Sequence, residues 1–82
     1  MSKSEDFQHF LDARGLECPL PLLKTRLALK NLADNEVLLV SATDSGSWQD
    51  IPRYLAKSIY ALLSASESGG EYHFLIKKVN LK

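Results

Sequence analysis

The sequence predicts an α+β fold, a two-layer sandwich in which two helices pack on one face of a mixed four-stranded sheet. Two segments have the composition or spacing of helices, and four have the apolar runs or alternation of strands. Their order is strand, helix, strand, helix, strand, strand. Because the chain has only 82 residues, all six elements must share a single domain.

The first three elements follow from composition. Aromatic and aliphatic residues cluster at 7–12 before Gly15 interrupts the chain, which predicts a strand. Leu, Lys, Arg and Ala dominate residues 19–32, and these good helix formers predict the first helix. Residues 36–43 form a nearly continuous apolar run, which is typical of a central strand covered on both faces.

The second helix is expected from about residue 50 to residue 62. Four apolar residues recur there at helical spacing, namely Ile51, Leu55, Ile59 and Leu62. Ser47 and Asp50 have the spacing of a capping box, which makes the start ambiguous. Because Pro52 is better tolerated in a first turn, we expect Asp50 to be the cap.

The remaining residues predict a hairpin with a short strand after Leu63, a turn at 68–70 and a longer strand to about Val79. A strand–helix–strand unit needs a right-handed crossover, so the first two strands are expected to be parallel and the hairpin antiparallel. The polar residues 1–6 are expected to form a flexible N-terminus before a single domain of residues 7–82.

Charge and hydropathy exclude several classes of function. Ten Lys and Arg balance ten Asp and Glu, which leaves no large basic field for nucleic acid or an anionic membrane. Apolar runs are far shorter than the roughly 20 residues that span a bilayer, and the start of the chain lacks a signal peptide's apolar centre. We expect a cytoplasmic protein that is a monomer when free and binds neither nucleic acid nor membranes directly.

Chemistry is expected at Cys18, the single cysteine, which lies where the first strand leads into the first helix. Pro19 suits the first helical position, where its missing N–H removes no helical hydrogen bond, and Pro21 lies in the same turn. Cys18 should therefore lie at or beside the N-cap, exposed and facing the positive end of the helix dipole.

A strongly acidic thiol is not predicted at Cys18. The dipole lowers a thiol pKa only modestly, and the neighbouring Glu17 and nearby Asp12 oppose this effect while Arg14 assists it. A cysteine hydrolase would need a general base, and the spacing of His9 and His73 does not favour pairing with the cysteine. The residues match no recognised metal-ligand pattern, so no metal and no cofactor are predicted. The alternative for a lone cysteine is a small buried hydrophobic residue.

The segment Gly-Leu-Glu-Cys-Pro-Leu-Pro at residues 15–21 resembles the Cys-Pro-x-Pro signature of the TusA (SirA-like) family of small sulfur carriers. The resemblance extends from residues 11–13 to residues 72–78, almost the whole domain. It implies that Cys18 accepts sulfane sulfur from a cysteine desulfurase as a persulfide. The sulfur then passes to a downstream acceptor protein in tRNA thiolation, molybdenum-cofactor or other sulfur metabolism. The resemblance assigns the shaping of the motif to Gly15, Pro19 and Pro21.

Candidate partner contacts surround this motif. Family members often carry an acidic residue after the second strand, matched here by Asp44, and a basic residue just before Asp-Ile-Pro, where this chain has Gln49. This departure favours a partner different from that of the tRNA-thiolation members. Trp48 either covers the edge of the core or contacts the partner. The full set of candidates is Arg14, Glu17, Leu20, Leu23, Leu27, Asp44, Trp48, Asp50 and Arg53.

The first predicted helix carries two apolar stripes, although a helix on a sheet needs only one. The first stripe consists of Leu22, Thr25, Leu29 and Leu32, and the second consists of Leu20, Leu23 and Leu27. If the first covers the sheet, the second runs outward from beside Cys18 between basic residues and is available to a partner. The alternative is that both stripes are partly buried under the second helix.

Two functions from different classes fit these observations. In the first, the Cys18 thiolate attacks a donor persulfide and then surrenders the terminal sulfur, an exchange that needs an exposed sulfur more than an elaborate pocket. In the second, the chain is a non-catalytic interaction or regulatory module with a structural cysteine. The position of Cys18 discriminates between them, because a sulfur without a route to solvent could not be delivered.

Overall fold

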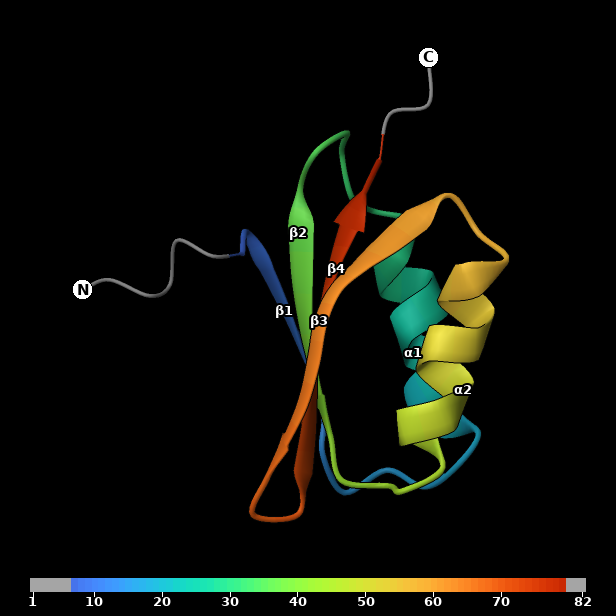
Figure 1. Ribbon diagram of the computed structural model, residues 1–82, viewed down its shortest axis with the longest axis vertical. Helices are drawn as coiled ribbons and strands as arrows, with labels where there is room; N and C mark the ends of the chain where they lie inside the picture. Colours follow the sequence, from blue (N-terminus) through green and yellow to red (C-terminus); the bar gives the residue numbers. More distant parts are fainter. Residues whose placement is uncertain (1–6, 80–82) are drawn as a thin grey trace, which may run out of the picture.

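The computed structural model describes residues 7–79, so the predicted flexible N-terminus at residues 1–6 lies outside the described residues. The elements, in chain order, are β1 (His9–Ala13), α1 (Leu20–Leu29), β2 (Val37–Ala42), α2 (Ser47–Ala56), β3 (Tyr60–Ser68) and β4 (Glu71–Lys78). The strands form one sheet in the order β1-β2-β4-β3, and both helices cover the same face of it (Figure 1). The predicted α+β two-layer sandwich is confirmed.

The sheet is mixed, as predicted. β1 pairs with β2 in parallel, whereas β4 runs antiparallel to both β2 and β3. β2 therefore lies inside the sheet between β1 and β4. Its side chains at Leu38, Val40 and Ala42 are buried, and so is Ser41 on the opposite face. Among residues 7–79 no helix covers that opposite face (Figure 1).

The hydrophobic core lies between the sheet and the two helices. Phe74 of β4 is fully buried at its centre. Both helices, the turn after α1 and the two inner strands supply the other core residues, which are Leu29, Leu32, Leu38, Val40, Ile51, Leu55 and Ile76. This layer fixes the orientation of both helices and therefore the position of the loops that precede them.

α1 begins one residue later than predicted, because Pro19 is its N-cap and Leu20 its first residue. A turn precedes the helix, in which the Leu20 N–H donates to the Glu17 carbonyl at 2.8 Å. Cys18 therefore lies just outside the cap. At the other end, the regular helix stops at Leu29. A tighter turn follows it, in which the Leu32 N–H donates to the Leu29 carbonyl.

The prediction that Asp50 caps the second helix is wrong. α2 begins at Ser47, and Pro52 lies inside it. The ring of Trp48 packs against Tyr72 and Phe74, with centroids 5.5 and 6.1 Å apart, and this contact anchors the early turn on the sheet. Because Pro52 removes only one helical hydrogen bond, this aromatic packing outweighs its preference for the first turn.

The predicted extension of the second helix to residue 62 is also wrong. α2 ends at Ala56, where Ser58 redirects the chain: its hydroxyl donates to the Leu55 carbonyl at 2.9 Å and accepts from the Tyr60 N–H at 3.1 Å. Ile59 is consequently exposed. β3 is longer than the predicted short strand, and a register shift between Leu62 and Ser64 interrupts its pairing with β4.

Candidate functional site

Cys18 is solvent-exposed in the loop between β1 and α1. Because β1 and β2 are parallel, the loops that follow them leave the sheet at the same edge and both lead into helices (Figure 1). The backbone N–H of Gly15 donates to Thr43 Oγ1 at 2.9 Å and ties the two loops together. Gly15 has a φ of 83°, a backbone conformation that favours glycine. The loops thus bring Cys18 beside the start of α2.

The sulfur of Cys18 is held by a hydrogen bond to a side chain of α2. Its Sγ donates to Asp50 Oδ2 at 3.3 Å. A Cβ at Gly46 would lie 3.8 Å from this sulfur and only 2.9 Å from Asp44 Oδ2, so glycine permits the close approach. Asp44 Oδ2 is itself buried and has no hydrogen-bond partner among residues 7–79. Two carboxylates therefore flank the thiol.

This setting raises the pKa of the Cys18 thiol. The hydrogen bond to Asp50 is the largest cause, followed by partial desolvation and then by the negative charges of Asp50 and Asp44. The helix end contributes little compensation, since Pro19 and Pro21 carry no N–H and the Leu20 N–H is already bonded. The modest activation expected from the helix dipole is thus outweighed, because the two carboxylates favour the protonated thiol over the thiolate.

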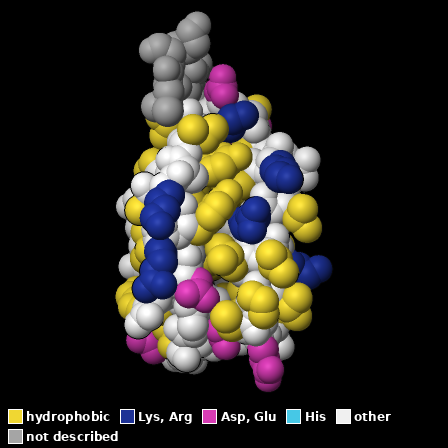
Figure 2. Space-filling view, turned by 90° about the vertical axis from the view of Figure 1, so that its right-hand side faces the viewer, with side chains coloured by type: hydrophobic (Ala, Val, Ile, Leu, Met, Phe, Trp, Pro, Cys, Tyr) yellow, Lys and Arg dark blue, Asp and Glu magenta, His cyan; other side chains and the backbone are white. Residues whose placement is uncertain are grey.

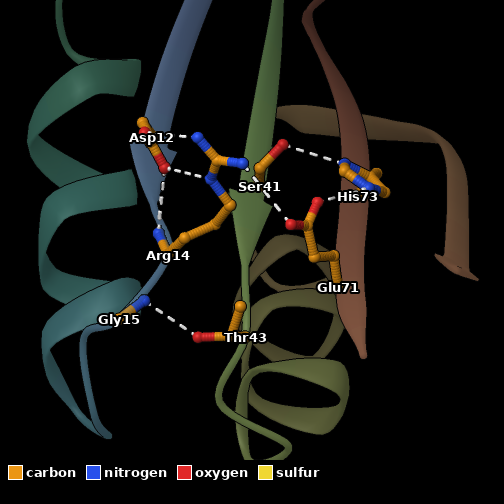
Figure 3. A network of polar contacts seen from close by, with 7 residues as sticks. All are labelled: Asp12, Arg14, Gly15, Ser41, Thr43, Glu71 and His73. Carbon is orange, nitrogen blue, oxygen red and sulfur yellow. Dashed lines mark hydrogen bonds and ion pairs between the residues drawn. The ribbon is translucent and has the colours of Figure 1, made fainter. Parts of the chain in front are cut away.

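Arg14 does not assist ionisation of the thiol, because its guanidinium is engaged on the uncovered face of the sheet (Figure 3). It donates to Asp12 through Nε at 2.8 Å and Nη2 at 3.0 Å, and to Glu71 through Nη1 at 3.4 Å. The hydrogen bonds that Asp12 accepts from the side chain and the backbone N–H of Arg14 lower the pKa of Asp12 to about 2. Across the same face, His73 Nδ1 and Ser41 Oγ share a hydrogen bond of 2.8 Å.

The second apolar stripe of α1 faces outward. Leu20, Leu23 and Leu27 are 45%, 43% and 62% exposed, whereas Thr25 and Leu29 on the other side of the helix are buried. A shallow groove of about 290 Å³ follows the outward stripe, lined by Leu23, Arg26, Leu27 and Lys30. Figure 2 shows apolar side chains along this helical face with Lys and Arg on both sides. Of the two alternatives for the second stripe, the outward orientation is therefore correct, and burial under the second helix is not.

The other candidate residues have distinct positions. The ring of Trp48 packs on the edge of the core and remains 41% exposed, so its contact with a partner stays a prediction. Glu17 and Arg53 are exposed, the latter in the last turn of α2. Of the polar candidates, only Asp44 and Asp50 act on the Cys18 sulfur. The sequence-based predictions did not include Gly46, which lies beside Cys18 and Asp44. The signal that could have identified it is a glycine in the loop after the second strand, which the parallel β1–β2 pair places next to the cysteine loop.

The two histidines are bonded elsewhere, His9 to Glu36 at 2.7 Å and His73 to Ser41. Within residues 7–79, no group of three or more His, Cys, Asp and Glu side chains could hold a metal ion. Over the same range, the helices are too short or too polar to cross a membrane.

Fold and site together define a small α+β protein that presents one exposed cysteine at the start of a helix, beside an apolar and basic helical face. The model of the family described as sulfurtransferase TusA matches residues 9–78. The chain therefore belongs to the TusA family, which confirms the resemblance seen in the sequence.

Two relatives cover nearly the full length of the chain. The sulfur carrier protein TusA of Allochromatium vinosum is 44% identical over 73 residues, which span 89% of this chain and 96% of that protein. A putative sulfur carrier protein of Halobacterium salinarum is 38% identical over 79 residues, which span 95% of this chain and 98% of that protein. The similarity is thus to whole proteins of the same size.

Proposed function

We propose that this protein is a cytoplasmic sulfur carrier: Cys18 accepts sulfane sulfur as a persulfide from a cysteine desulfurase and relays it to an acceptor protein. The observation that carries the proposal is the exposure of the single cysteine beside an uncovered apolar helix face. Membership of the TusA family and the names of two full-length relatives support it. An exposed sulfur is reachable by a second protein, which a relay requires.

The exchange balances in atoms and electrons without another reactant. The Cys18 thiolate attacks the terminal sulfur of the donor's persulfide, and a new S–S bond forms while the donor's S–S bond breaks. The electron pair of the broken bond leaves on the donor cysteine, which takes up the proton that Cys18 lost. An acceptor thiolate then attacks the terminal sulfur on Cys18, which restores the free cysteine.

We propose that the surfaces beside Cys18 determine which proteins bind the carrier. The outward stripe of α1 supplies apolar contact area, and Arg26 and Lys30 supply positive charge at its rim. Trp48 presents a half-exposed aromatic ring on the neighbouring helix. We assign these surfaces to recognition of the desulfurase and the acceptor, which serves tRNA thiolation, molybdenum-cofactor assembly or another branch of sulfur metabolism.

Sulfur loading tests the proposed function directly. The full chain, incubated with an active cysteine desulfurase and cysteine, should gain a mass of about 32 Da, one sulfur atom, that dithiothreitol removes. Intact-protein mass spectrometry measures the gain, and peptide mapping should place it on Cys18. If the protein gains no mass while the same desulfurase loads another carrier, the sulfur-carrier function is wrong and a non-catalytic interaction module is favoured.

The outward face of α1 is tested by Leu27→Glu. The substitution removes exposed apolar contact area and adds a charge, so the dissociation constant for the desulfurase should rise about tenfold or more. Because Leu27 is largely exposed, the melting temperature should change by no more than about 3 °C. Calorimetric titration and thermal denaturation measure the two effects.

The matched control for that surface is Leu63→Glu, which makes the same chemical change at an exposed leucine of β3. This variant should bind the desulfurase as the wild type does. Equal weakening by both variants would contradict the assignment of docking to α1. A large loss of stability in Leu27→Glu would instead place that residue in the core.

A further inference from the structure

We infer that Asp50 is a positioning residue for the sulfur site: its carboxylate holds the Cys18 thiol as a protonated hydrogen-bond donor and keeps the free, unloaded carrier weakly reactive. The inference rests on the proposed function, because it concerns the same sulfur. It goes beyond that function by assigning to one side chain the control of the sulfur's reactivity before a partner binds.

The contact between Asp50 and Cys18 is built by the tertiary structure. The backbone N–H of Asp50 donates to the Gly46 carbonyl at 2.9 Å, which fixes this residue in the first turn of α2. The Gly15–Thr43 hydrogen bond holds the cysteine loop against the loop before α2. With both backbones fixed, Asp50 Oδ2 lies 3.3 Å from the Cys18 sulfur and accepts its hydrogen bond.

The charged groups around the sulfur reinforce this effect. α2 contributes Asp50, and the loop before it contributes Asp44, whose buried Oδ2 has no partner among residues 7–79. The cysteine's own loop contributes Glu17 and Arg14, but Arg14 is bonded on the uncovered face of the sheet. In α1, the first basic residue is Lys24, which lies more than one helical turn after the N-cap Pro19. The carboxylates therefore dominate around the thiol.

Two carboxylates oppose formation of the thiolate, which is the nucleophilic form of cysteine. A direct hydrogen bond to a carboxylate stabilises the protonated thiol, and the negative charge destabilises the ionised sulfur. A free carrier in this state exchanges slowly with disulfides and resists oxidation, although its sulfur is exposed. The Cys18 sulfur is thus exposed for delivery to a partner, yet it reacts slowly while the carrier is free and unloaded.

The test is the pH dependence of Cys18 alkylation by iodoacetamide. Because the chain has one cysteine, the rate reports a single site. Wild type and Asp50→Asn are compared as full-length chains from pH 6 to pH 11, roughly the range in which cysteine thiols ionise. The asparagine variant should show its midpoint at lower pH and react roughly threefold faster at neutral pH. Its plateau at high pH should stay equal or fall slightly, since a more acidic thiol is a weaker nucleophile.

Three further variants separate charge control from structural effects. Asp50→Glu keeps the carboxylate and should restore a midpoint close to that of wild type. Asp44→Asn should shift the midpoint downward by less than Asp50→Asn, because Asp44 acts on the sulfur through space. Glu67→Gln makes the same change in net charge on exposed β3 and should leave the midpoint unchanged. Thermal denaturation confirms folding, and Asp50→Ser replaces Asp50→Asn should that variant not fold.

The inference is overturned if the midpoint of Asp50→Asn equals that of wild type, or if Glu67→Gln moves it equally. A change confined to the plateau would also overturn it, because Asp50 would then control access rather than ionisation. Alkylation requires no desulfurase, so either result leaves sulfur loading to be judged separately. Conversely, a protein that fails to load sulfur can still show the shifted midpoint.

Discussion

Replacing Cys18 with serine should abolish sulfur loading completely. The chain has one cysteine, so no second thiol can form a persulfide in its place. A serine hydroxyl does not ionise near neutral pH and cannot take part in exchange between thiolates and persulfides. After incubation with a desulfurase and cysteine, intact-protein mass spectrometry should detect no gain of about 32 Da in this variant.

The same variant should retain the fold and the docking surface. Cys18 is exposed, and a serine hydroxyl can still donate a hydrogen bond to Asp50. Its melting temperature should stay within about 3 °C of the wild-type value, as expected for a surface substitution. Its affinity for the desulfurase should also be preserved, since the outward face of α1 is unchanged. A serine variant that still gains sulfur would show that the sulfur binds elsewhere and would refute the role of Cys18.

The largest expected loss of stability comes from Leu29→Ala. Leu29 is fully buried in the core cluster, and truncating a buried leucine costs about 2–5 kcal/mol. A domain of this size has a total stability of only about 5–10 kcal/mol, so the variant should lose a large part of it. Its melting temperature should fall by about 10 °C or more.

Leu27→Ala is the matched control, made two residues earlier on the same helix. Leu27 is 62% exposed, so its truncation should change the stability by no more than about 0.5 kcal/mol. Both variants make the same change in helix propensity, which isolates the contribution of burial. Urea and thermal denaturation measure the difference. Equal losses in both variants would contradict the orientation of α1 on the sheet.

Local patterns were sufficient to predict the order of the elements, the parallel β1–β2 pair and the antiparallel hairpin, which the sheet pairing confirms. They were insufficient for the ends of α2. Apolar spacing predicted that the helix continues through Ile59, but the hydrogen bonds of the Ser58 hydroxyl end it earlier. The position of Pro52 predicted a start at Asp50, but the packing of Trp48 on the sheet anchors an earlier turn. Spacing and proline preference describe local geometry, whereas the contact of Trp48 with Tyr72 joins distant parts of the chain.

The outward stripe of α1 illustrates the same limit. Both stripes were visible as mainly leucine residues at helical spacing, and the sequence left open which of them the core would use. Burial of Leu29 and exposure of Leu27 decide the question, because only the packed sheet determines which face of the helix it covers.

The sequence alone determined the architecture and singled out Cys18, because strand and helix periodicity, proline positions and a lone cysteine are properties of short segments. Only the tertiary structure decided what surrounds the sulfur. Asp50 is 32 residues away from Cys18 along the chain and meets it because parallel strands direct two loops to the same edge of the sheet. The pKa of a thiol depends on such through-space neighbours, which local sequence patterns do not specify.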